Sequence, residues 1–181
     1  MAPYEESTRV PLVISGPGVA RGRTSAMATS IDYGPTILDL AGVPIPADVD
    51  GASLVPTFGG GVPSGWRKDF FGQYASDGVT DRDGIFQEYT EGDNKEIYLI
   101  DVPSWSSPRT ERYVYIRWYD LERSMTKREY ELYDLVKDPY QLHNLLATPT
   151  GRRQHADLAA QLGKRMAELS SCQGATCRTT G

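Results

Sequence analysis

Residues 112–120, with the sequence RYVYIRWYD, carry the clearest structural signal in this 181-residue chain. Valine, isoleucine and tryptophan alternate there with tyrosine and arginine, so an extended backbone places an apolar face opposite an amphipathic one. Residues 130–135 alternate again after a charged connection. The two segments are therefore predicted to pair as an antiparallel hairpin. Asp138 and Pro139 are predicted to stop the second strand, because proline has no amide hydrogen to donate.

A helix is predicted near the C-terminal end of the sequence. Thr148 can accept a hydrogen bond at the start of this helix, and Pro149 suits its first turn. Apolar residues then recur at intervals of four, four and three, which is the spacing of one helical face. This face is predicted to pack on one side of the hairpin sheet. Its residues are Leu158, Leu162, Met166 and Leu169.

The first half of the chain has a different pattern. Residues 9–15 form an apolar, β-branched run closed by a Gly-Pro-Gly turn, which predicts a buried strand. Asp32 can cap a following short helix that ends before Gly42. Short strands are predicted further along, at residues 69–74, 85–89 and 96–102.

These patterns divide the chain into two parts and predict an α/β fold. Residues 1–95 are typical of a piece of an α/β sheet domain, and residues 96–181 of a small antiparallel sheet packed by the C-terminal helix. The second part is predicted to cover its own core. The first part has too few strands to cover its own faces, which would leave a sheet edge and apolar surface exposed.

Composition and charge exclude several functions. The chain has 19 Lys and Arg residues against 24 Asp and Glu residues, a net charge of -5. This balance lacks the basic footprint that nucleic acid selects, so no nucleic-acid partner is expected. No apolar run reaches the roughly 20 residues that a membrane-spanning helix needs. The first residues show neither the basic nor the apolar region of a signal peptide.

Two cysteines, Cys172 and Cys177, lie near the C-terminal end. Their spacing and the intervening glycine allow a local disulfide, and a pair of reduced thiols is the alternative. A disulfide would indicate a secreted or extracytoplasmic protein, although this chain shows no signal peptide. A metal site is not predicted, because the two histidines, His143 and His155, are neither paired nor near the cysteines.

Three blocks of the sequence resemble a known family. Residues 4–13, YEESTRVPLV, are similar to the segment that follows an active-site lysine in type I sulfatases of the alkaline-phosphatase-like superfamily. Residues 31–42, IDYGPTILDLAG, resemble the helix behind the active site of that family, and DGASL follows at residues 50–54. Residues 131–135 and 138–145, ELYDL and DPYQLHNL, resemble the C-terminal subdomain. The blocks stand in the order expected of the family.

A further match narrows the resemblance. Residues 104–116 contain Ser-Trp, then Arg-Thr, then Tyr-Val-Tyr-Ile, an arrangement similar to N-acetylglucosamine-6-sulfatase-like members. The resemblance implies that residues 1–95 are the C-terminal part of the sulfatase catalytic α/β domain and that residues 96–181 are its C-terminal subdomain. It also implies a sulfated carbohydrate as the partner of the full-length enzyme.

The resemblance implies a mechanism for the full-length enzyme as well. A Cys or Ser in a Cys/Ser-x-Pro/Ala-x-Arg motif becomes formylglycine, which attacks sulfur while a calcium or magnesium ion neutralises the sulfate oxygens. Neither Cys172 nor Cys177 stands in such a motif, and no serine does. The nucleophile, the metal ligands and the acid are therefore expected before residue 1. No catalytic residue and no metal ligand is assigned in this chain, which is predicted to be inactive alone.

Trp105 and Arg109 are the candidate substrate-binding residues. An indole offers a stacking face for a sugar, and a guanidinium offers a forked donor for sulfate or carboxylate. Packing and surface pairing are the alternative roles for both residues. Asp32 is interpreted as a helix cap rather than as half of a metal pair with Asp39. Arg9 is interpreted as pairing with one of the two glutamates before it.

Two other functions stay open at this point. One is a non-catalytic module that binds a sulfated glycan or completes a separately encoded N-terminal half. The other is a fragment of a phosphoester or phosphonate hydrolase, because these enzymes share the sheet and metal site of the superfamily. The segment that carries the nucleophile distinguishes a phosphonate hydrolase from a sulfatase.

Overall fold

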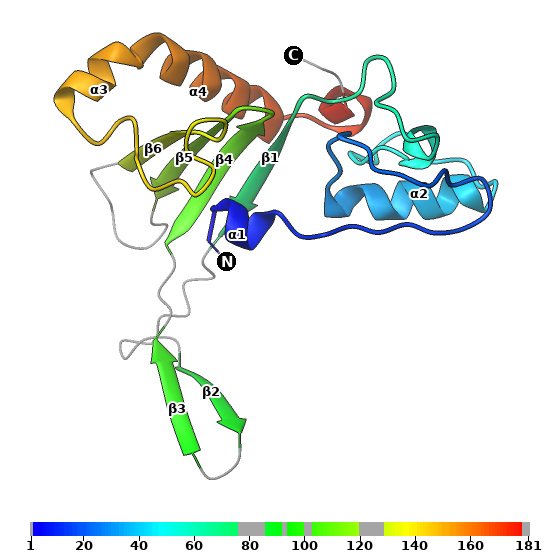
Figure 1. Cartoon of the computed structure of the whole chain (residues 1–181), viewed down its shortest axis with the longest axis horizontal. Helices are drawn as coiled ribbons and strands as arrows, with labels where there is room; N and C mark the ends of the chain where they lie inside the picture. Colours follow the sequence, from blue (N-terminus) through cyan, green and yellow to red (C-terminus); the bar gives the residue numbers. More distant parts are fainter. Residues whose placement is uncertain (1, 76–85, 92–93, 100–102, 120–128, 179–181) are drawn as a thin grey trace.

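The computed structural model describes residues 2–75, 86–91, 94–99, 103–119 and 129–178. Apart from a two-stranded hairpin, this part of the chain forms two bodies (Figure 1). The larger body is a four-stranded sheet with helices over one face. The smaller body consists of short helices and connecting segments. We call the smaller body, residues 10–67, the first lobe.

The sheet is antiparallel throughout, with the strand order β1-β4-β5-β6. The predicted hairpin is confirmed, since Tyr113 lies opposite Asp134 in the β5–β6 register. β1 pairs with β4, so the sheet begins at Asp69, well before the division at residue 95 that the sequence indicated. The strands are β1 (Asp69–Tyr74), β4 (Ser104–Thr110), β5 (Tyr113–Tyr119) and β6 (Glu129–Asp134).

Two helices cover one face of this sheet. α3 (Pro149–Gln154) follows Thr148, whose hydroxyl accepts a hydrogen bond from the Gly151 amide at 3.0 Å. The predicted single helix is interrupted at His155, and α4 (Ala156–Ser170) continues from there. α4 contacts β1, β4 and β5, so the predicted packing of a C-terminal helix on the sheet is confirmed.

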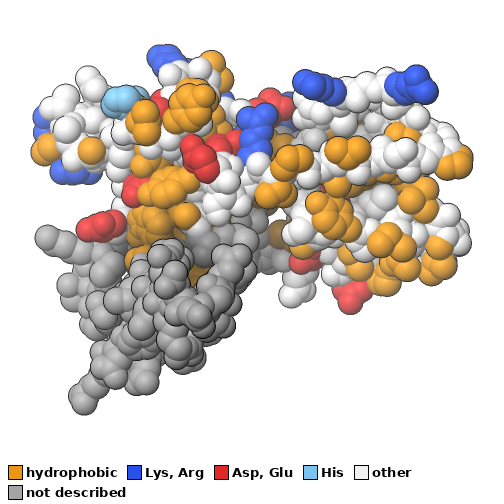
Figure 2. Space-filling model, turned by 60° about the horizontal axis from the view of Figure 1, so that its bottom comes forward, with side chains coloured by type: hydrophobic (Ala, Val, Ile, Leu, Met, Phe, Trp, Pro, Cys, Tyr) orange, Lys and Arg blue, Asp and Glu red, His pale blue; other side chains and the backbone are white. Residues whose placement is uncertain are grey.

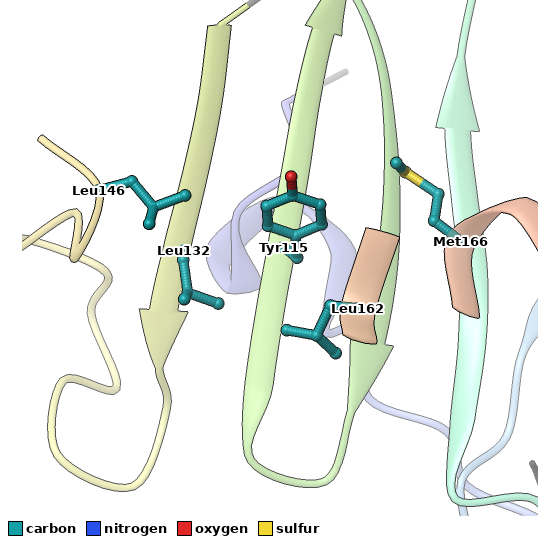
Figure 3. Close-up of a cluster of buried hydrophobic side chains, with 5 residues drawn as sticks. All are labelled: Tyr115, Leu132, Leu146, Leu162 and Met166. Carbon is teal, nitrogen blue, oxygen red and sulfur yellow. The ribbon is translucent and has the colours of Figure 1, made fainter. Parts of the chain in front are cut away.

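The core beneath α4 forms on the tyrosine-bearing face of β5 (Figure 3). Leu162 and Met166 of α4 pack with Tyr115 and Leu132 of the sheet, and all four are buried. Leu146, which follows β6, belongs to the same cluster. The helix therefore covers the amphipathic face of the predicted strand, where tyrosine rings supply large apolar areas.

The opposite face of the sheet carries a second cluster of buried side chains. It includes Trp105 from β4 and Val114 and Ile116 from β5, each no more than 3% exposed. Tyr4, the residue before the single-turn helix α1 (Glu5–Thr8), packs on this cluster. Both faces of the predicted strand are thus buried, one under α4 and one under the chain start.

β4 is the strand that the sequence did not predict. Pro108 stands inside it, and proline is usually confined to edge strands or bulges. The register accommodates this proline, because β4–β5 pairing stops at Ser106 and resumes at Arg109. On its other side Pro108 lies opposite Phe71 of β1.

A separate two-stranded antiparallel sheet is formed by β2 (Phe86–Glu91) and β3 (Asn94–Leu99). The predictions of strands at 85–89 and 96–102 are confirmed for the residues that the structure describes. Residues 85 and 100–102 lie outside them.

The first lobe contains η1 (Ser30–Asp32), α2 (Tyr33–Leu40) and η2 (Val55–Thr57). The strand predicted for residues 9–15 is wrong. None of these residues belongs to a helix or a strand, and Val13 is 87% exposed. A strand needs a neighbour to satisfy its amide and carbonyl groups, and neither described sheet includes this segment. An apolar, β-branched composition is therefore not enough to form a strand here, because the segment has no neighbouring strand to pair with.

A buried ion pair holds the first lobe together. Asp32 is 0% exposed, and its carboxylate accepts hydrogen bonds from both terminal nitrogens of Arg67 at 2.7 and 3.1 Å. It also accepts from the amides of Thr29 and Ala52 at 2.7 and 2.8 Å. Asp32 stands at the N-cap position of α2, as predicted, but its side chain does not cap that helix, because these partners lie outside it. Gly42, at a φ of 68°, follows the helix end as predicted.

The Arg67→Met variant is predicted to destabilise the chain by about 3–5 kcal/mol, because it leaves the Asp32 carboxylate buried without its charged partner. Lys164→Met is the control. The Lys164 side chain is 83% exposed and its partner Glu168 is 47% exposed, so breaking this ion pair should cost far less. Urea unfolding followed by circular dichroism measures both costs. Equal costs for the two variants would contradict a structural role specific to the buried pair.

Candidate functional site

The chain start is fixed to the sheet face opposite α4. The Tyr4 ring packs against Trp118 and Tyr133, with ring centroids 6.5 and 6.3 Å apart. Its hydroxyl donates a hydrogen bond to Glu131 Oε2 at 3.2 Å, across 127 positions of sequence. The residues that resemble the segment near a sulfatase active site are therefore held by strands from the far end of the chain.

Glu131 is the common acceptor in this site. Its carboxylate accepts from Trp118 Nε1 at 3.0 Å and from the Tyr133 hydroxyl at 2.8 Å, in addition to Tyr4. Burial and the nearby charge of Glu131 raise the pKa of Tyr4 to about 12. Burial and the hydrogen bond to Glu131 also raise the pKa of Tyr133. Both hydroxyls are therefore protonated donors at neutral pH.

Glu5 adds an ion pair to this attachment. Arg109 donates from Nε and Nη2 to the two carboxylate oxygens of Glu5 at 3.1 and 3.0 Å, and both side chains are mostly buried. Because two parallel hydrogen bonds join the guanidinium to the carboxylate, they fix the relative orientation of the two side chains as well as their separation. Arg9 Nη1 lies 3.9 Å from Glu5 Oε2, and the Arg9 side chain is 78% exposed. The predicted pairing of Arg9 with a glutamate is therefore confirmed as a surface contact.

Gln141 holds the backbone of α1. The Glu5 amide donates to Gln141 Oε1 at 2.7 Å. Gln141 is buried and has a φ of 53°, which is uncommon for a residue other than glycine. Its Nε2 is buried and has no hydrogen-bond partner among the described residues. The loop after β6 thus keeps a residue in an unfavourable conformation at the point where it meets α1.

The two predicted substrate-binding residues lie in the same part of the fold. Trp105 is 3% exposed, and its ring lies so close to Gly72 that an added Cβ would come within 3.2 Å of it. Arg109 is engaged by the Glu5 carboxylate. The structure thus gives both residues the packing and pairing roles that the sequence left as the alternative. Contact of either residue with substrate stays a prediction.

The remaining candidate residues have structural roles. Asp138 accepts from the amides of Leu142 and His143 at 3.1 and 2.8 Å, so it stabilises the loop after β6, beyond the point where the strand stops. His143 is exposed, and His155 lies at the break between α3 and α4. Within the described ranges, no group of three or more His, Cys, Asp or Glu side chains is placed to hold a metal ion.

The two cysteines form a disulfide. The Cα atoms of Cys172 and Cys177 are 5.1 Å apart, and the prediction of a local disulfide is confirmed. Because the sulfurs are bonded to each other, neither one is available as a nucleophile or a metal ligand.

Glu131 and Gln141 were not identified as site residues from the sequence. Glu131 did carry a signal, since it lies opposite Ile116 and so shares a buried face with apolar side chains. A charged residue at such a position needs buried partners. Gln141 carried no local signal, because its partner Glu5 lies 136 positions away.

Tyr4 is predicted to titrate near pH 12 rather than near 10. Because the folded state favours the protonated form, the stabilising attachment of Tyr4 is complete below about pH 10 and is lost as the pH rises toward 12. Ring-carbon NMR of tyrosine-labelled protein measures the titration, with Tyr4→Phe to assign the signal and Tyr140→Phe, at an exposed tyrosine, as the control. A Tyr4 midpoint near pH 10 would contradict its burial against Glu131.

Comparison with known proteins relates the chain to one family. Residues 2–80 match the family described as N-sulphoglucosamine sulphohydrolase, C-terminal. N-acetylglucosamine-6-sulfatase of Bos taurus is 33% identical over 98% of this chain, which covers 32% of the relative. The Homo sapiens protein of the same name is 32% identical, with the same two coverages. N-acetylglucosamine-6-O-sulfatase of Bacteroides thetaiotaomicron is 31% identical over 91% of this chain and 25% of the relative.

Solved structures agree with this relation. A complex of a protein with its substrate D-glucosamine-2-N,6-O-disulfate has a TM-score of 0.58 at 26% identity, over 80% of this chain and 24% of that one. The phosphonate monoester hydrolase of Agrobacterium radiobacter has a TM-score of 0.52 at 22% identity, over 77% of this chain and 24% of that one, and shares the fold alone. The chain spans about a third of the length of the mammalian relatives. The predicted α/β fold is confirmed, and so is the predicted similarity of this chain to the C-terminal region of sulfatases.

Proposed function

We propose that this chain is the C-terminal part of a sulfatase that hydrolyses the sulfate ester of a sulfated sugar. The observation that carries the proposal is the 33% identity to N-acetylglucosamine-6-sulfatase along 98% of the chain. The Bacteroides relative is named for the same sulfate position, and the neighbouring structure contains a 6-O-sulfated glucosamine. N-acetylglucosamine-6-sulfate is accordingly the substrate that we propose for the whole protein.

In the proposed enzyme this chain is scaffold and supplies no catalytic group. Its sequence contains no formylglycine motif, and its two cysteines are bonded to each other. The calcium or magnesium ion that the family implies does not fit the described residues, since they offer no suitable group of ligands. We propose that the ligands and the nucleophile belong to polypeptide that the longer relatives have in addition.

The scaffold role is supported by the attachment of α1. Tyr4 and Glu5 are tied to β4, β6 and the loop after β6 by the Glu131, Arg109 and Gln141 contacts. The family resemblance places these first residues directly after an active-site lysine. Fixing them to the sheet would position that neighbouring catalytic segment, because a displacement of about 1 Å at a reacting group can cost about a hundredfold in rate.

The first lobe presents an apolar surface that supports the same proposal. Figure 2 shows hydrophobic side chains gathered over this lobe. An exposed patch of this kind usually marks an interaction site in a soluble protein. We propose that the α/β sheet of the whole enzyme covers it. The exposed apolar side chains of this lobe include Val10, Leu12, Val13, Ile14, Ile31, Ile37, Leu40 and Val43.

We also propose an extracytoplasmic location. The Cys172–Cys177 disulfide supports it, because disulfides persist in oxidising compartments. Among the described helices, none combines the length and the apolar character needed to cross a bilayer.

The isolated 181-residue chain is predicted to release no inorganic sulfate from N-acetylglucosamine-6-sulfate or from an aryl sulfate with calcium present. The polypeptide encoded by joining the in-frame upstream coding sequence to this chain is predicted to release sulfate. Alanine at the cysteine or serine of its formylglycine motif should abolish that release. Ion chromatography measures sulfate directly.

Two results would contradict the proposal. Turnover by the isolated chain, abolished by a substitution within it, would show that the chain carries its own catalytic groups. Hydrolysis of a phosphonate monoester but not of a sulfate ester by the joined polypeptide would instead favour a phosphonate hydrolase.

A further inference from the structure

The loop closed by Cys172 and Cys177 lies between the two bodies of the fold. It begins directly after α4, which packs on the sheet of the larger body. The short helix η3 (Gly174–Arg178) contains most of this loop and lies beside the first lobe (Figure 1). One end of the loop is therefore anchored in the sheet body, and its centre reaches the first lobe.

The contact with the first lobe is specific for glycine at position 174. The Gly174 amide donates to Asp50 Oδ1 at 2.6 Å. Gly174 is buried at a φ of 54°, and an added Cβ would lie 2.2 Å from the Ala47 carbonyl oxygen. Any other side chain would meet both a strained backbone conformation and a collision with backbone.

The segment that receives this contact is tied to the core of the first lobe. The Ala52 amide donates to the Asp32 carboxylate, which holds Arg67. Gly51 lies against the backbone of Ile31, where an added Cβ would be 2.0 Å from the carbonyl oxygen. Residues 47–52 therefore connect the disulfide loop directly to the buried ion pair.

The two bodies have separate internal packing. α2 packs against η1 and η2 within the first lobe, whereas α4 packs against β1, β4 and β5. The disulfide loop supplies a non-covalent contact between them through Asp50 and Ala47. A change in the conformation of the disulfide loop would therefore weaken the attachment of the first lobe to the sheet body.

We propose that the Cys172–Cys177 disulfide is a redox-sensitive latch that holds the first lobe on the sheet body. A dithiol reductant would give two electrons and two protons to the S–S bond, forming two thiols and becoming a disulfide itself. The opened loop then samples many conformations and no longer presents Gly174 to Asp50. The first lobe loosens while the sheet, whose core is independent of the loop, stays folded. The latch does not depend on the proposed sulfatase activity.

Hydrogen exchange of the isolated chain tests the latch. Treatment with a dithiol, or the Cys172→Ser/Cys177→Ser double variant, is expected to raise exchange in peptides covering residues 47–52 by about tenfold, a size typical of local opening. Peptides covering β4 and β5 are expected to keep the exchange of the oxidised protein. Mass spectrometry of alkylated thiols reports the fraction reduced in the same samples.

Two glycine variants distinguish the effect of the Gly174 contact with the first lobe from the effect of the disulfide bond. Gly174→Ala keeps both cysteines but collides with Ala47, so it is expected to raise exchange at 47–52 without reduction. Gly60→Ala is the matched control, because Gly60 has a φ of 86° with nothing within 4 Å of an added Cβ. Unchanged exchange at 47–52 in the double-serine variant would overturn the latch. An equal rise in β4 and β5 would overturn it too, because the disulfide would then stabilise the whole fold.

Discussion

The two-point ion pair between Glu5 and Arg109 joins the beginning of the chain to the middle of its sheet, across 104 positions of sequence. α1 is a single turn with no buried residue of its own, so it relies on this pair together with the Gln141 and Tyr4 contacts. The pair also brings Tyr4 onto the apolar face of the sheet. The second core cluster is therefore covered in part by Tyr4, whose neighbour Glu5 is held by a contact that no local sequence pattern predicts.

The two bodies of the fold differ in how completely they cover their apolar side chains. The sheet body covers both of its faces with its own chain, using α4 on one side and Tyr4 on the other. The first lobe is held internally by Asp32 and Arg67 but leaves a row of apolar side chains exposed. In a sulfatase, the closed body would serve as the support, and the open lobe would serve as the surface on which the remainder of the enzyme packs.

Local patterns predicted the elements whose structure is local in origin. The β5–β6 hairpin and the C-terminal helical stripe followed from periodicity, and the disulfide followed from spacing. The strand prediction for residues 9–15 was wrong because a strand also needs a neighbouring strand. β4 was missed because it contains Pro108, which only the particular register of that strand accommodates. Glu131 and Gln141 depend on partners more than a hundred positions away, which periodicity does not reveal.

Specific contacts fix the start of the chain to the sheet. A double-mutant cycle with Glu5→Gln and Arg109→Met measures the strength of the ion pair among these contacts through the free energies of unfolding in urea. We expect a coupling energy of about 1–3 kcal/mol, because the pair is mostly buried and doubly hydrogen-bonded. Costs that add with no coupling would mean that the Glu5–Arg109 pair contributes nothing to holding α1 on the sheet.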